Sequence, residues 1–239
     1  MSNIIAAEWR KQRLLPFIIP LVCGPLLLIA IMYVAIRYQM NNGLNSIQTI
    51  QTISNLLQEL WSYIVIIVVM IFSSAVAEVE HRSKTWTLLF IAPQPKWKHL
   101  AVKVGLAAVL CQLFGLLSWL AISVAGMWNE GSLVQSLALL GRYSYGPFLF
   151  ALPYILFQTT LAQIIRNTFV VNTIGMAVFL LHQSLPYWWL PWGAVLQYVT
   201  LLPGSSLTVP IAALLVNLIL YGLFSFMLFY RESFILRGE

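Results

Sequence analysis

The stretch LWSYIVIIVVMIFSSAVA, residues 60–77, runs for eighteen residues without a charged side chain. An apolar run of about this length can cross the hydrocarbon core of a bilayer as an α-helix. No glycine or proline separates this stretch from the charged segment that begins at Glu78. Because these two residues interrupt helices most strongly, the span and the start of the charged segment are predicted to form one stiff helix.

The composition of the whole chain also indicates a membrane protein. Of the 239 residues, 60% are hydrophobic and 8% are charged, whereas soluble globular domains carry about 25% charged residues. So few charges cannot cover a surface that faces water, but a lipid bilayer requires no polar surface. The sequence therefore predicts an all-α integral membrane protein whose residues 1–239 form a single transmembrane domain.

Six apolar segments are predicted to cross the membrane. Residues 1–13, which precede the first of them, are predicted to form a short interfacial helix. Pro16, Pro20 and Pro25 fall in the first span, which is therefore predicted to begin late or to kink. The six predicted spans cover residues 14–36, 60–77, 101–125, 145–165, 168–184 and 207–230.

Two segments between the spans have distinctive compositions. Residues 78–100 are charged and form the main predicted cytoplasmic loop. Residues 185–206 are rich in aromatic residues and proline, and they include Trp188, Trp189 and Trp192. Since amphipathic rings prefer the membrane–water boundary, this second segment is predicted to be an external interfacial or re-entrant segment. Its tryptophans either anchor the ends of the spans or contact a substrate.

The distribution of basic residues predicts the orientation, because Lys and Arg accumulate on the cytoplasmic side of membrane proteins. If both termini are cytoplasmic, eleven of the thirteen Lys and Arg lie inside, and Arg37 and Arg142 lie outside. The inverted topology would place those eleven outside. They are Arg10, Lys11, Arg13, Arg82, Lys84, Lys96, Lys98, Lys103, Arg166, Arg231 and Arg237.

The sequence lacks the residues that several classes of active site require. The chain has no Asp, no Gly-rich phosphate loop ending in Gly-Lys-Ser/Thr and no His-Glu-x-x-His motif. Cys23 and Cys111 lie in apolar stretches and are predicted to be buried, with no metal site. No ionisable residue is predicted deep within a span, which argues against a proton-coupled carrier. The net charge of +6 is explained by topology, so no nucleic-acid partner is predicted.

The charged part of the loop carries helix-stabilising pairs. Glu78 and Arg82 are spaced i, i+4, and so are Glu80 and Lys84. In both pairs the acid is N-terminal to the base, which is the favourable order on a helix. The segment is therefore predicted to continue as a helix into the cytoplasm.

The second part of the loop carries an apolar stripe. Trp86, Leu89 and Phe90 are spaced so that they share one helix face, and Pro93 is predicted to end the helix. Two interpretations fit this pattern. The helix either lies on the inner leaflet of the bilayer, or it is a docking helix for a cytoplasmic partner.

These features together resemble the membrane permease subunit of type-2 ABC exporters. That family has an N-terminal elbow helix, six spans and a first cytoplasmic loop with a conserved pattern. Glu8-Trp9-Arg10-Lys11 is similar to the opening of the elbow. The sequence departs from the family in having Ser83-Lys84 before the Thr and Gln94-Pro95-Lys96 after the Pro. The positions that match the loop pattern are Glu78 or Glu80, Thr85, Leu88, Leu89, Pro93, Lys96 and Lys103.

The resemblance implies a dimer with a second permease copy or a homologous permease, with spans one, two and five at the interface. Each copy would dock on a separate cytoplasmic ABC ATPase subunit, which would bind ATP and Mg. This chain would then bind no cofactor and carry no catalytic residue. The coupling helix between spans two and three would provide the partner-binding residues, namely Glu78, Glu80, Arg82, Thr85, Trp86, Leu89, Phe90 and Pro93.

The short chain and small loops are most similar to bacteriocin, lantibiotic-immunity or bacitracin-type export permeases of the bacterial plasma membrane. The implied substrate is an amphipathic peptide antibiotic or bacteriocin, which Trp188, Trp189 and Trp192 could contact. Two other functions stay open from the sequence. The chain could be a non-transporting membrane anchor or sensor subunit, or a stand-alone membrane enzyme or secondary carrier.

Overall fold

A computed structural model describes most of the chain, and all the regular structure in the described residues is helical, as predicted. The described residues are 15–41, 46–83, 96–130, 145–165, 167–181, 184, 187–200 and 206–235. The predicted interfacial helix at 1–13 lies outside them. The helices are α2 (Leu15–Asn41), α3 (Ser46–Ser83), α5 (Lys96–Glu130), α7 (Gly146–Phe150), α8 (Leu152–Ile164), α9 (Thr168–Leu181), α10 (Gly193–Val199) and α11 (Thr208–Ile235).

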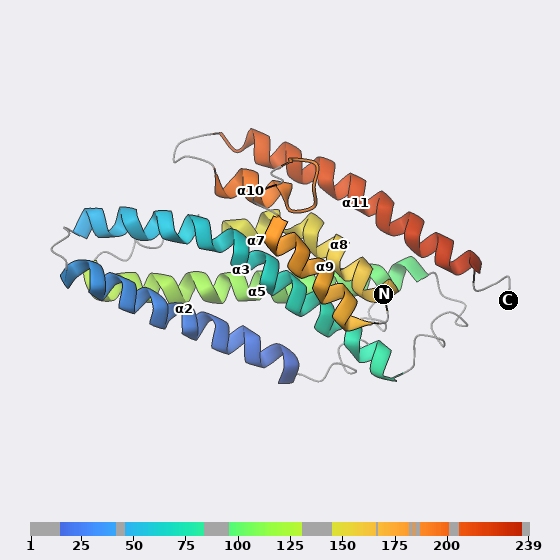
Figure 1. Ribbon diagram of the computed structural model, residues 1–239, viewed down its shortest axis with the longest axis horizontal. Coiled ribbons are helices and arrows are strands. Elements are labelled where there is room, and N and C mark those ends of the chain that lie inside the picture. Colours follow the sequence, from blue (N-terminus) through green and yellow to red (C-terminus); the bar gives the residue numbers. More distant parts are fainter. Residues whose placement is uncertain are drawn as a thin grey trace.

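Helix α3 lies at the centre of the bundle and packs against α5, α8 and α9 (Figure 1). Helix α2 lies along α5 on one side. Helices α10 and α11 pack against each other on the opposite side, where α11 also contacts α8. Helix α3 ends, α5 begins and α11 ends at the same end of the bundle, on the right in Figure 1. The predicted topology assigns this end to the cytoplasm.

Three helices contain stretches that are long and apolar enough to cross a membrane. These stretches are Leu60–Val79, Trp97–Val124 and Thr208–Leu228. Two further apolar stretches, Phe17–Ile31 and Thr168–Val178, are shorter. Each of the six predicted spans coincides with helical structure, but six membrane crossings stay a prediction.

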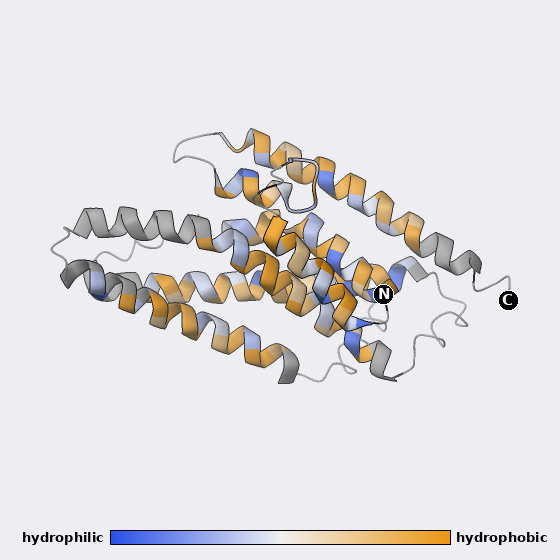
Figure 2. Cartoon of the chain, in the orientation of Figure 1, coloured by the Kyte–Doolittle hydropathy of each residue, from blue (hydrophilic) through white to orange (hydrophobic). Residues whose placement is uncertain are grey.

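The surface of the bundle is apolar where a soluble protein would be polar. Exposed side chains along α2 include Leu26, Leu27 and Val34, and those along α11 include Leu215 and Ile219. Figure 2 shows apolar residues along the outer sides of these helices. An apolar surface of this extent suits a hydrocarbon environment, so the chain is a multi-pass membrane protein.

Prolines shape two of the predicted spans. Helix α2 begins at Leu15 and continues through Pro20 and Pro25, so of the two predicted alternatives the late start is wrong and the kink stays a prediction. Membrane helices tolerate such prolines because neighbouring groups satisfy the backbone that each proline leaves unpaired. The fourth span is divided at Ala151 into α7 and α8. Pro147 and Pro153 lie in the first turns of these two helices, where proline is favoured because no N–H is required.

The core toward the predicted external half of the bundle is aromatic. The ring of Trp61 in α3 meets that of Phe148 in α7 edge-on, with centroids 5.9 Å apart. Phe114 of α5 packs against Phe148 at 5.7 Å and against Phe72 of α3 at 6.4 Å. The Trp61–Phe148 and Phe72–Phe114 pairs are edge-to-face and the Phe114–Phe148 pair is tilted, and aromatic pairs of this kind stabilise by about 1 kcal/mol beyond the buried area. This cluster fixes α3, α5 and α7 relative to one another.

Candidate functional site: a polar cluster on α8 near the predicted cytoplasmic loop

The predicted partner-binding loop is described only at its two ends. Helix α3 is continuous through the end of the span to Ser83, as the absence of glycine and proline predicts. Glu78 is half-buried in it, and Glu80 and Arg82 lie in its last turn. Lys96 opens α5 on the other side of the loop. The remaining predicted partner-binding residues lie outside the described residues: Thr85, Trp86, Leu89, Phe90 and Pro93.

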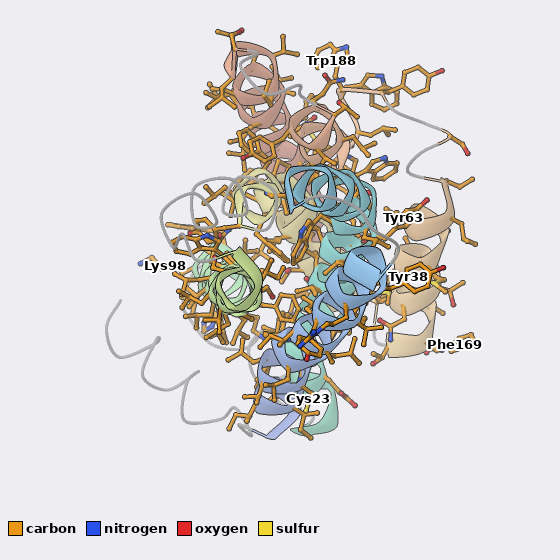
Figure 3. The ribbon with its side chains drawn as sticks, turned by 90° about the vertical axis from the view of Figure 1, so that its left-hand side faces the viewer. Cys23, Tyr38, Tyr63, Lys98, Phe169 and Trp188 are labelled. Carbon is orange, nitrogen blue, oxygen red and sulfur yellow. The ribbon has the colours of Figure 1, made fainter. Side chains whose placement is uncertain are left out.

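The predicted substrate-contacting tryptophans separate into two groups. Trp188 and Trp189 are 51% and 48% exposed, and Trp188 projects from the edge of the molecule (Figure 3). Their backbone carbonyls accept hydrogen bonds from Asn217 and Tyr221 of α11, at 2.8 and 3.3 Å. Trp192, by contrast, is 8% exposed and belongs to the core. The exposed aromatic surface therefore consists of Trp188 and Trp189 together with Tyr187, whose ring stacks on Trp189.

A cluster of polar side chains that the sequence analysis did not single out lies inside the bundle, on α8. Within six residues α8 carries Gln158, Thr159, Thr160 and Gln163, and each is 0% exposed. An α-helix turns by about 100° per residue, so consecutive positions point in different directions. Because other helices surround α8, these side chains reach different neighbours.

Two of these side chains bond to the helices that lead into and out of the predicted cytoplasmic loop. The hydroxyl of Thr159 lies 3.0 Å from that of Ser73 in α3. The ammonium of Lys103 in α5 donates to Oε1 of Gln163 at 3.2 Å. Both links are buried, and each closes a separation of more than fifty residues along the chain.

The other two polar side chains of α8, Gln158 and Thr160, bond to helices that come later in the chain. Nε2 of Gln158 donates to the carbonyl of Val171 in α9 at 3.3 Å. The hydroxyls of Thr160 and Ser225, in α11, are hydrogen-bonded at 2.8 Å. Residues 158–163 of α8 thus bond to α3, α5, α9 and α11. We call these six residues the α8 polar segment.

A nearby link joins α3 directly to α9. The hydroxyl of Ser74 donates to Oδ1 of Asn172 at 2.6 Å. Helix α9 starts at Thr168, and Oδ1 of the preceding Asn167 accepts from the N–H of Phe169 at 3.0 Å, as an N-cap asparagine does. Interhelical hydrogen bonds between membrane helices contribute about 0.6 kcal/mol on average and up to about 1.7. The set as a whole therefore fixes the register of the helices.

Lys103, which the predicted topology counts on the cytoplasmic side, is a buried cation near the start of the predicted span 101–125. Its side chain is 2% exposed and packs between α5 and α8. Gln163 is the second-last residue of α8, and the partial negative charge of a helix C-terminus favours a cation there. The burial of Lys103 could have been suspected from the sequence, because this residue falls within the predicted span 101–125.

Each glutamine of the α8 polar segment uses one of the two polar atoms of its amide group in the bonds just described. Among the described residues, Oε1 of Gln158 and Nε2 of Gln163 have no hydrogen-bond partner. A buried polar group without a partner is costly, more so in hydrocarbon. The segment therefore keeps a free acceptor and a free donor beside bonds that are already made. In the sequence, this segment could have been recognised as a run of amide and hydroxyl side chains inside an otherwise apolar span.

The chemistry of this cluster is that of a joint between helices. It consists of neutral amides, hydroxyls and one ammonium, which donate and accept hydrogen bonds. Within the described ranges, no group of three or more His, Cys or Glu could hold a metal ion.

Comparison with known proteins identifies the family. Residues 4–184 match the family described as "ABC-2 family transporter protein". The searches of curated proteins and of solved structures gave no match. The matched range covers most of the chain, from the segment before α2 to the end of α9, and includes the predicted loop and the α8 polar segment. This chain belongs to the ABC-2 family of transporter proteins.

Proposed function

We propose that this chain is the membrane permease subunit of an ATP-driven exporter in the bacterial plasma membrane, with both termini in the cytoplasm. Membership of the ABC-2 family over residues 4–184 is the observation that carries the proposal. ATP and Mg bind to a separate ABC ATPase subunit, and this chain supplies the membrane path and the docking surface. The excess of basic residues at the proposed cytoplasmic end supports the orientation.

The ATPase subunit docks on residues 78–99. Helix α3 ends at Ser83 and α5 begins at Lys96, at one end of the bundle. A subunit bound between them would act on two long helices at once. The helical continuity of α3 from Leu60 to Ser83 supports this role, because a stiff helix passes displacement on with little loss.

The functional unit in this proposal is a dimer, formed with a second copy or with a related permease. Spans one, two and five would line the interface. The exposed apolar face of α2, which includes Ile19, Leu26 and Leu27, is compatible with burial against such a partner.

The proposed substrate is an amphipathic peptide, such as a bacteriocin or a peptide antibiotic against which the cell protects itself. The half-exposed rings of Tyr187, Trp188 and Trp189 support this choice. They present apolar faces and polar edges beside the middle of α11, where the carbonyls of Trp188 and Trp189 accept hydrogen bonds from Asn217 and Tyr221. Such rings can contact the apolar face of a peptide and its cationic groups.

The first test is co-purification of the tagged chain in mild detergent, with identification of bound proteins and an ATPase assay. We expect a stoichiometric ATPase, which should be lost when Trp86, Leu89 and Phe90 are replaced by Gln. A Glu78→Ala, Glu80→Ala double variant should still insert in the membrane but should uncouple ATP hydrolysis from transport. Loss of insertion in that variant would contradict a docking role, and absence of any ATPase would favour a carrier. An ATPase without substrate movement would favour an anchor or sensor subunit.

The substrate is tested by growth of a sensitive host that expresses the chain and its ATPase, against a panel of cationic amphipathic peptides. A Trp188→Ala, Trp189→Ala variant should lose protection against the peptide that the wild type resists. Phe169→Ala is the control, because Phe169 is also an exposed aromatic residue but lies in the first turn of α9 (Figure 3). Equal protection by both variants would remove the aromatic surface from the substrate path.

A further inference from the structure

We propose that the α8 polar segment, residues 158–163, positions α11 relative to α3 and α5, and so passes movement of the cytoplasmic loop to α11. The inference rests on the proposed function, because it takes an ATPase bound at the loop as the source of movement. Its positioning residues are Thr159 and Gln163 on the input side and Thr160 on the output side.

The input links lie close to the loop. Ser73 is ten residues before the end of α3, and Lys103 is seven residues after the start of α5. At about 1.5 Å per residue these positions are roughly 15 and 10 Å from the helix ends. Displacement of either helix end therefore acts on α8 through Thr159 or Gln163, whose bonds to Ser73 and Lys103 are buried.

The output link connects α8 to the helix that is farthest along the chain. Helix α11 packs mainly against α8 and α10, and its Ser225 is 2% exposed and bonded to Thr160. Most of the remaining surface of α11 is apolar and exposed, including Leu223 and Phe226. Because apolar packing between membrane helices has no hydrophobic driving force, the buried hydroxyl pair provides directional contact between α8 and α11.

The free amide groups suit a joint that changes partners. Gln158 has a free acceptor, and Gln163 has a free donor, within the described residues. When the helices shift, these groups can form new hydrogen bonds while the old ones break. Packed helices with polar links switch between discrete arrangements in this way instead of deforming continuously.

The test uses the full-length chain with its co-purified ATPase in lipid nanodiscs, with spin labels and pulsed distance measurements. Cys23 is first replaced by Ser so that it does not take label. A label pair at positions 26 and 97 reports movement at the start of α5, and a pair at 26 and 223 reports movement of α11. The residues replaced by Cys, Leu26, Trp97 and Leu223, are all exposed in the single copy, and only labelled protein that keeps its dimeric state and its ATPase activity is compared. Distances are compared without nucleotide and with ATP, Mg and vanadate.

We expect both label pairs to respond to nucleotide in the wild type. Thr160→Val, which keeps the shape and removes the hydroxyl, should keep the response at 26/97 and lose at least half of the response at 26/223. Thr160→Ser should restore it. Gln163→Leu should reduce the α11 response as well. Substrate exported per ATP hydrolysed should fall in parallel in the two impaired variants.

The matched control is Thr173→Val, because the hydroxyl of Thr173 is exposed and its one hydrogen bond among the described residues stays within its own helix, to the carbonyl of Phe169. A full α11 response in Thr160→Val, or equal loss in Thr160→Val and Thr160→Ser, would overturn the inference. A wild-type response at 26/97 without one at 26/223 would also overturn it. If the wild type responds at neither pair, the proposed ATP-driven function fails instead, so the two failures are distinguishable.

Discussion

The ammonium nitrogen of Lys103 lies 3.2 Å from Oε1 of Gln163, and both side chains are buried between α5 and α8. A buried charge is costly unless hydrogen bonds and local dipoles compensate for it. Gln163 supplies a carbonyl oxygen, and the end of α8 supplies a favourable dipole. The pair also fixes the orientation of the amide, because the oxygen must face the ammonium.

The first prediction concerns the coupling between these two residues. Lys103→Met and Gln163→Leu should each destabilise the protein, and the double variant should lose less than the sum of the two. We expect an interaction free energy of about 0.5–2 kcal/mol, as for other interhelical hydrogen bonds to charged groups. The measurement is unfolding of the four proteins in mixed micelles with increasing SDS. Lys103 makes further interactions, so only the cycle isolates the pair. Strict additivity would contradict the coupling.

The second prediction concerns the tight turn before α10. A Cβ atom on Gly193 would lie 2.5 Å from the carbonyl oxygen of Tyr187 and 2.7 Å from that of Trp188. Backbone atoms cannot move aside cheaply, so Gly193→Ala should destabilise the protein by about 1–3 kcal/mol. Gly222→Ala is the control, because no atom of the described residues, apart from its chain neighbours and the backbone of its own helix, lies within 4 Å of its Cβ position. Thermal unfolding in detergent compares the two, and equal melting temperatures would show that the turn tolerates a side chain.

The third prediction tests the packing of α9 on α3. A Cβ atom on Gly175 would lie 2.7 Å from Sδ of Met70 and 3.1 Å from Nε2 of Gln158. Gly175→Ala should therefore cost about 1–3 kcal/mol through overpacking. Shortening Met70 to Ala removes the nearest atoms, so the double variant should be more stable than the sum of the single effects predicts. The same unfolding assay measures all three variants, and a cost that Met70→Ala does not relieve would place the conflict at Gln158.

The fourth prediction concerns the two cysteines. Cys23 on α2 is exposed on the apolar surface, whereas Cys111 on α5 is buried. The sequence predicts that both cysteines are buried, and this prediction is wrong for Cys23. In detergent-solubilised monomer, a small maleimide should label Cys23 within the time that leaves Cys111 unlabelled, because only an accessible thiol can ionise and react. Cys23→Ser should abolish the native labelling, and mass spectrometry of digested protein gives the extent at each site. Rapid labelling of Cys111 in the folded protein would contradict the packing of α5.

The α-helical membrane character of the protein follows from the sequence by itself. A bilayer requires that every backbone group be bonded within its own segment, so apolar runs such as residues 60–77 become helices whatever their neighbours are. The stiff connection from Trp61 through Glu78 to Arg82 could be predicted because it lacks glycine and proline, and α3 is continuous there. The resemblance to ABC exporter permeases agrees with the family match.

The contacts among helices were decided only by the tertiary structure. Hydropathy assigns Lys103, Gln158 and Gln163 to a span or its edge, but it does not say whether they face lipid or another helix. That choice depends on which helices surround α8, and this is set by packing between segments far apart in the chain. The same holds for Trp188 and Trp192, which have identical side chains and nearby positions but opposite exposure. Solvation by lipid therefore determines the elements locally, whereas the burial of polar groups is a property of the assembled bundle, because hydrogen bonds between helices exist only once the helices are adjacent.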